Sequence, residues 1–91
     1  MTTTKHWSVE VSIGENDGRT YAEARLQTSD NDTTELRGHG EARLNPADED
    51  VPEIGDEVAV ARALSDLGHR VLLAAAADIR AISDEPVHLH R

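Results

Sequence analysis

Two histidine-containing groups and one acidic run have the residue types that could do chemistry. The first is Gly38-His39-Gly40, within the stretch LRGHGEARL. A dinucleotide or phosphate-binding loop needs further glycines, a Lys-Ser/Thr pair and a helix directly afterwards, and this stretch has none of them. His39 could act as a general base, but no Ser, Cys or second His is placed by local spacing to work with it. We therefore predict an exposed strand histidine, no catalytic residue and no enzyme.

The other two groups are candidate metal ligands. His88 and His90 form an H-x-H pair that could hold a metal weakly. The acidic run DEDVPEIGDE, 48–57, lacks the twelve-residue pattern of a calcium loop with its glycine at position six and its glutamate at position twelve. The chain has no cysteine, so no thiolate ligand is available. We predict no metal site and no small-molecule cofactor.

Three segments of the sequence alternate between apolar and polar residues, as half-buried strands do: 5–13, 19–28 and 34–44. The third segment contains His39. Polar turns separate them, the first carrying Asp17-Gly18 and the second spanning 29–33. Short turns predict an antiparallel three-stranded sheet. The expected inward residues include Trp7, Val9, Val11, Ile13, Ala22, Ala24, Leu26, Leu36, Gly38, Gly40, Ala42 and Leu44.

Glycines on the inward face predict close approach of something bulky, such as Trp7 or a helix, or else a bulge. From about Asp56 the period changes to that of a helix, expected over 56–82. Its apolar stripe is expected to consist of Val60, Leu64, Leu67 and Val71. A helix of this length would measure about 40 Å, so it must overhang the sheet, or break near Gly68 or after Ala77.

These elements predict an α+β protein with a three-stranded sheet covered by one long, possibly broken, C-terminal helix. The 91 residues form a single domain, 1–91, with an ordered core of about 5–84 and a tail at 85–91. The chain has 19 Val, Ile and Leu residues, 12 alanines and no phenylalanine, a thin supply for a core. A thin core and an overhanging helix predict a homodimer.

Arginines recur at alternate positions of the second and third strands, so the pleat gathers them on the outward face. The candidate binding residues there are Arg19, Tyr21, Arg25, Arg37, His39 and Arg43. Two readings stay open: cross-strand ion pairing with glutamates on the same face, or a face that binds RNA or an acidic partner.

The overall charge limits this second reading. The chain carries 9 Lys and Arg against 18 Asp and Glu, a net charge of −9, which opposes non-specific DNA binding. The start MTTTKHWSVEV has no apolar signal region, and no apolar run is long enough for a membrane span. We expect a cytoplasmic protein without a membrane partner.

Three motifs resemble one known family: W-x-V-x-V-x-I at 7–13, G-x-G-x-A-R-L-N-P at 38–46 and V-P-E-I-G-D-E-x-A-x-A-R-A-L-S-D-L at 51–67. They are similar to small actinobacterial proteins grouped as a domain of unknown function with a double-stranded-RNA-binding-domain-like fold. The resemblance implies a βββα core, a cytoplasmic protein and, through fold analogy with ribosome-hibernation factors, a stress or dormancy role on ribosomes or structured RNA. The alternative is a dimeric protein–protein adaptor or regulator that binds no nucleic acid.

Overall fold

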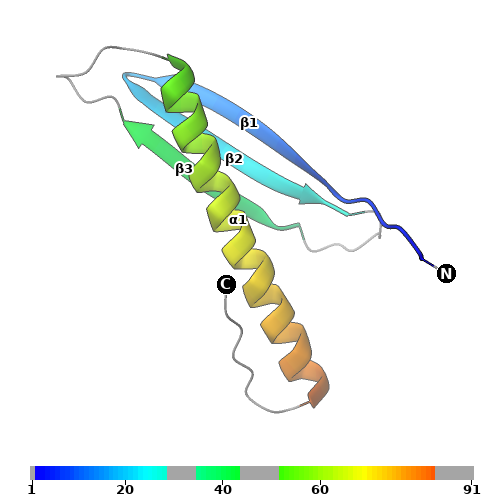
Figure 1. Cartoon of the computed structure of the whole chain (residues 1–91). Helices are drawn as coiled ribbons and strands as arrows, with labels where there is room; N and C mark the ends of the chain where they lie inside the picture. Colours follow the sequence, from blue (N-terminus) through cyan, green and yellow to red (C-terminus); the bar gives the residue numbers. More distant parts are fainter. Residues whose placement is uncertain (1, 29–34, 44–51, 84–91) are drawn as a thin grey trace.

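The chain forms a two-layer structure in which one helix lies across one face of a sheet (Figure 1). The computed structural model describes residues 2–28, 35–43 and 52–83. Its elements are β1 (Ser8–Asn16), β2 (Arg19–Gln27), β3 (Arg37–Arg43) and α1 (Pro52–Ser83). The strands form one antiparallel sheet in the order β1-β2-β3. The predicted α+β class and three-stranded antiparallel sheet are confirmed. The expected turn at 29–33 and the tail with His88 and His90 lie outside the described residues.

The β1–β2 connection is a two-residue turn at Asp17 and Gly18. Both residues have positive φ, 51° and 74°. This is the backbone that a type I′ hairpin requires and that Asp-Gly favours. The turn pairs Asn16 with Arg19, and the register then runs to Ser8 opposite Gln27. The prediction that the first strand occupies 5–13 is therefore wrong by three residues, because the turn sets where pairing starts.

The most deeply buried part of the contact between helix and sheet consists mainly of alanines, with larger half-buried side chains packed around it. The buried hydrophobic residues of the described chain are Ala22, Ala24, Ala42, Ala59, Ala63 and Leu67. Small side chains let two backbones approach closely, and each alanine removes little apolar surface from water. The core is therefore closely packed but thin.

Gly38 and Gly40 are the points of closest approach. A Cβ atom added at Gly38 would lie less than 3.0 Å from backbone atoms of Ala63 and Leu67, and one at Gly40 would meet the backbone of Ala59 and Ala63. The predicted close approach is confirmed, and the helix rather than Trp7 makes it, since Trp7 remains 54% exposed.

The helix is longer than predicted and has no break. It begins at Pro52 rather than Asp56, in agreement with the preference for proline in the first helical turn, and continues through Gly68 to Ser83. Its 32 residues correspond to about 48 Å, so the C-terminal turns extend past the sheet (Figure 1). Of the two alternatives, overhang or breakage, the structure shows the overhang.

The helix also presents a different stripe to the sheet than its most apolar residues predict. Ala59, Ala63 and Leu67 are buried, whereas Leu64 is 43% exposed and Val60 and Val71 are half-buried. The predicted stripe is thus rotated toward one flank of the helix. The physical reason is the close approach itself, because the helix backbone at Ala59, Ala63 and Leu67 lies directly against Gly38 and Gly40, and this orientation turns Leu64 away from the sheet.

The inward face of β1 remains largely uncovered. The helix packs on β3 and β2 and hardly touches β1. Val9 is 41% exposed and Ile13 49% exposed, while Val11 between them packs partly against the core. Trp7, Val9 and Ile13 were expected on the inward face, and they remain exposed there because the helix lies too far toward β3 to cover them.

Candidate functional site

The outward face of the sheet collects the six candidate binding residues. Three come from β2 and three from β3, and the register sets Arg19 opposite Arg43 and Arg25 opposite Arg37. Like charges placed directly opposite each other destabilise a sheet. The face therefore requires nearby carboxylates, and four glutamates supply them, namely Glu10, Glu23, Glu35 and Glu41.

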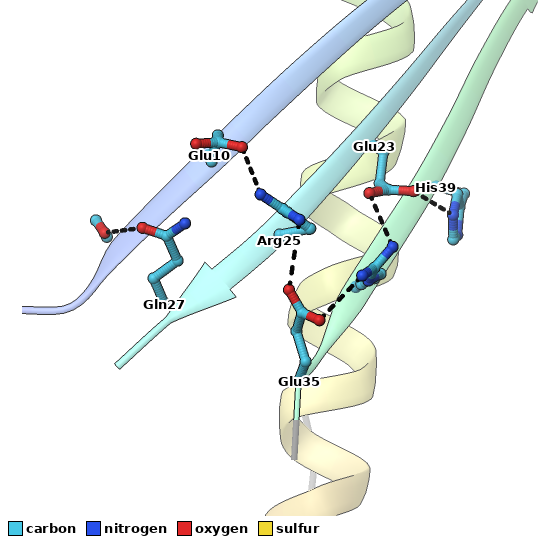
Figure 2. Close-up of polar contacts among 8 residues, drawn as sticks. Glu10, Glu23, Arg25, Gln27, Glu35 and His39 are labelled. Carbon is cyan, nitrogen blue, oxygen red and sulfur yellow. Dashed lines mark hydrogen bonds and ion pairs between the residues drawn. The ribbon is translucent and has the colours of Figure 1, made fainter. Parts of the chain in front are cut away.

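Where Arg25 lies opposite Arg37, at one end of the β2–β3 pairing, the two arginines share the carboxylate of Glu35, and Figure 2 shows Glu35 beside Arg25. Arg25 lies 2.6 Å from Glu10 and 3.6 Å from Glu35. Arg37 lies 2.9 Å from Glu35 and 3.4 Å from Glu23. Glu35, just before β3, thus joins both arginines, and the ion pairs run across all three strands.

The ion pair between Glu35 and Arg37 shifts the pKa of both groups. A hydrogen bond from Arg37, followed by its charge, lowers the pKa of Glu35 below its usual value. The same partner, Glu35, raises the pKa of Arg37. Both side chains are partly exposed, so the pair contributes little to stability. Its consequence is that both groups stay charged and already partnered across the ordinary pH range.

His39 is an exposed strand histidine, as predicted. Its side chain is 63% exposed and its Nε2 lies 3.2 Å from Glu23. Its backbone N–H donates a 2.8 Å hydrogen bond to Asp66 of the helix. That bond, together with a second one from Arg70, lowers the pKa of the Asp66 carboxyl. Through its backbone, this position therefore anchors the helix to β3.

A second helix side chain contacts the same strand edge. Arg62 donates a 2.6 Å hydrogen bond to the carbonyl oxygen of Glu41. Asp66 and Arg62 were not identified from the sequence. The two residues are four positions apart, so they lie on the same flank of the helix, opposite its apolar flank. This spacing could have marked them as a polar pair, but it does not identify the strand residues that they contact.

One end of the face is less completely paired. Arg19 lies 3.8 Å from Glu41, and its pKa is raised mainly by a hydrogen bond with the Tyr21 phenol. Tyr21 is 42% exposed. Within the described residues, Arg43 makes no ion pair. This end holds the cations that are most available to an outside group.

An open groove of about 480 Å³ lies where the helix leaves the edge of β3, lined in part by Glu35, His39, Arg70 and Leu73. The sequence did not predict that these residues lie together. Across 2–28, 35–43 and 52–83, no three acidic or histidine side chains gather as metal ligands. The groove therefore shows no donor set for a metal ion.

These features define a small α+β domain with an ion-paired polar sheet face and a thin, small-residue core. The chain matches the Rv2632c-like family over residues 5–88 and belongs to that family. Among the described residues, no helix combines the length and apolar character needed to span a bilayer.

Relatives of known sequence and structure agree with this assignment. An uncharacterised protein of Mycobacterium bovis is 54% identical over 85 residues, covering 93% of this chain and 87% of the relative. The uncharacterised Rv2632c of Mycobacterium tuberculosis is 44% identical over 83 residues, 91% of this chain and 86% of its own length. The crystal structure of Rv2632c superposes with a TM-score of 0.81 over 93% of this chain and 98% of that chain. Membership of an actinobacterial family is confirmed, whereas the likeness to RNA-binding domains and hibernation factors stays a prediction.

Proposed function

We propose that this protein is a non-enzymatic, cytoplasmic protein–protein adaptor whose outward sheet face binds a protein of complementary mixed charge. The observation that carries the proposal is the carboxylate sharing at the Arg25–Arg37 end of the face, where Glu35 and Glu23 engage Arg37 and Glu35 also engages Arg25. A phosphate would have to displace these carboxylates before it could bind the arginines.

The charge of the face supports the same proposal. Its four arginines are matched by four glutamates, and the whole chain carries −9. Nucleic-acid affinity at physiological salt comes largely from excess cationic charge at the contact surface. An ion-paired face suits a protein partner better, since alternating charges give specificity and steer encounter without requiring net charge.

Photo-crosslinking from Tyr21 tests the proposal. A photoreactive phenylalanine analogue at Tyr21, activated in cells, is expected to give a product that protease degrades and nuclease leaves intact. Arg37→Ala combined with Arg43→Ala should abolish that product while the chain stays folded, because both side chains are exposed. The same analogue at Glu57, exposed on the helix, serves as the control position. A nuclease-sensitive product at Tyr21 would contradict the adaptor function.

The second candidate is a stress- or dormancy-associated module that binds ribosomes or structured RNA. In this candidate function the fold is of the double-stranded-RNA-binding-domain type. The observation that favours it is the end of the face where Arg43 lies opposite Arg19 and beside Tyr21. Arginines can clamp a phosphate there while the ring stacks on a base.

Sedimentation with ribosomes from stressed cells separates the two candidates. The adaptor should remain in the supernatant at low salt. A ribosome-binding protein should co-sediment, lose binding at raised salt and lose it on Arg43→Ala, with Arg80→Ala on the exposed helix end as the charge-matched control.

A further inference from the structure

We infer that the open edge of β1 pairs antiparallel with β1 of a second copy, which joins two sheets into one six-stranded sheet. The inference concerns the opposite face and edge of the molecule from the proposed adaptor surface. It therefore stands or fails independently of that proposal.

The direction of the backbone groups in each strand follows from one hydrogen bond and the register. Leu26 N–H donates to the Leu36 carbonyl at 3.0 Å, so the even-numbered residues of β2 point their backbone groups toward β3. Its odd-numbered residues then point toward β1, because antiparallel strands alternate in this respect. Since Arg25 pairs with Glu10, the even-numbered residues of β1 face β2.

The odd-numbered residues of β1 consequently point their N–H and C=O groups to the outside of the sheet. These residues are Val9, Val11, Ile13 and Glu15. Within the described chain, no hydrogen bond occupies these groups. A row of unpaired backbone groups along an edge is a template for another strand.

The other edge of the same sheet is partly capped by the chain itself. On β3, the outward-pointing groups belong to the odd-numbered residues. Asp66 accepts the N–H of His39 and Arg62 donates to the carbonyl of Glu41. Helix side chains thus cap β3, whereas β1 has no cap, no proline and no lysine.

The side chains of β1 favour a second copy as the occupant. Val9 and Ile13 are 41% and 49% exposed on the inward face. A two-fold register centred on Val11 places Val9 opposite Ile13 of the other copy and Glu10 opposite Ser12. No like charges are then opposed across the new pair, and apolar side chains meet on the inward face.

The single chain exposes more surface than a compact monomer of its mass, in part because the helix overhangs the sheet, so it has surface available for an interface. Its accessible surface is 7257 Å², against about 5,200 Å² for a compact monomer of 9.9 kDa. The radius of gyration is 16.8 Å, against about 12 Å for a compact chain of this length. The excess area, about 2,000 Å², exceeds the roughly 800 Å² that each partner contributes to a standard interface.

Amide hydrogen exchange on the unmodified protein, combined with light scattering, tests the pairing. We expect twice the 9.9 kDa chain mass at micromolar concentration. We also expect Val9, Val11 and Ile13 amides to be as protected as those of Glu10 and Ser12. A dimer with unprotected odd-numbered amides would overturn the inference, because another face would then make the dimer. A monomer would overturn it too, with or without protection.

Two variant pairs sharpen the test. Val9→Lys with Ile13→Lys should give a monomer, or raise the dissociation constant at least about a hundredfold, because two charges enter an apolar junction. Ser8→Lys with Ser12→Lys, on the opposite face of the same strand, should remain dimeric. Equal behaviour of the two variants would contradict the pairing. If the first variant unfolds, the exchange pattern of the unmodified chain decides.

Salt dependence gives a final discriminating measurement. Each copy carries −9, so long-range repulsion opposes association and salt screens it. Raising NaCl should therefore strengthen the dimer. A dimer that dissociates as salt rises would be held by ion pairs rather than by β1, which contradicts the inference.

Discussion

β1 and β3 are the two edges of one sheet, and they differ in almost every respect that matters for packing. Gly38 and Gly40 bring β3 so close to the helix that a single added carbon would meet helix backbone. On β1, Val9 and Ile13 point to the same inward face of the sheet but remain 41% and 49% exposed. One face of the sheet thus carries the tightest contact with the helix at one edge and uncovered apolar side chains at the other.

This difference arises from where the helix lies, not from the strands' alternating patterns. Both strands alternate between two faces, but Val9 and Ile13 are bulky where β3 has glycines. A helix can approach a surface of glycine and alanine closely, and it remains farther from a surface of valine and isoleucine. The more apolar strand is therefore the more exposed one, which leaves it available for association.

The largest expected effect comes from adding a methyl group at the tight contact. Gly38→Ala should destabilise the fold by about 3 kcal/mol or more, because the new carbon would press on backbone that cannot rotate away. Thermal or denaturant unfolding measures the change. Gly68→Ala is the control, with open space around it and a helical position, and should stabilise by about 0.5–1 kcal/mol. Similar losses at both positions would show that the helix does not lie against β3 as described.

The second-largest expected effect is a difference in stability loss between alanine variants of two leucines on neighbouring flanks of the helix. Leu67, 4% exposed, should lose about 2–4 kcal/mol of stability on change to alanine, through lost burial and a cavity. Leu64, 43% exposed, should lose less than about 1 kcal/mol. Chemical denaturation of both variants checks the order. The reverse order would restore the Leu64-centred stripe and contradict the observed rotation of the helix.

The smallest effect concerns the cap on β3. Hydrogen bonds from His39 and Arg70 lower the folded-state pKa of Asp66. A lowered folded pKa means that this contribution to stability is fully present above the unfolded value, ordinarily 3.8, and is lost as pH falls through the folded value.

Asp66→Asn should therefore weaken the neutral-pH fold slightly and flatten its loss of stability on acidification below about pH 4. Melting temperatures across pH 2–7 make the measurement. Asp78→Asn, exposed on the same helix, should keep the parent profile. Identical profiles for the two variants would mean that Asp66 does not cap the edge.

Much of the candidate site was predictable, because it depends on the strand period alone. Alternation places Arg19, Arg25, Arg37 and Arg43 on one face, and their exposure follows from the apolar residues on the other face. Which carboxylate joins which arginine was not predictable. Glu35 lies outside the strand bounds, and its distances to both Arg25 and Arg37 depend on the β2–β3 register.

The contacts that His39 and Glu41 make with the helix could not be predicted from the sequence. Asp66 and Arg62 lie 27 and 21 positions away from their partners in the chain. No local pattern links residues at that distance, since only the crossing of helix and strand brings them together.

The sequence by itself determined the order of three strands and a helix, the Asp17-Gly18 turn and the sorting of each strand into two faces. Periods of 2 and 3.6 and the turn chemistry act over a few residues, so local composition suffices. The tertiary structure decided which face of the helix is buried. Hydrophobicity favoured Val60, Leu64, Leu67 and Val71, but against the glycine surface of β3 the most deeply buried helix residues are Ala59, Ala63 and Leu67. It also decided that β1 stays uncovered, because a single helix that packs closely on β3 and β2 is too narrow to cover a third strand.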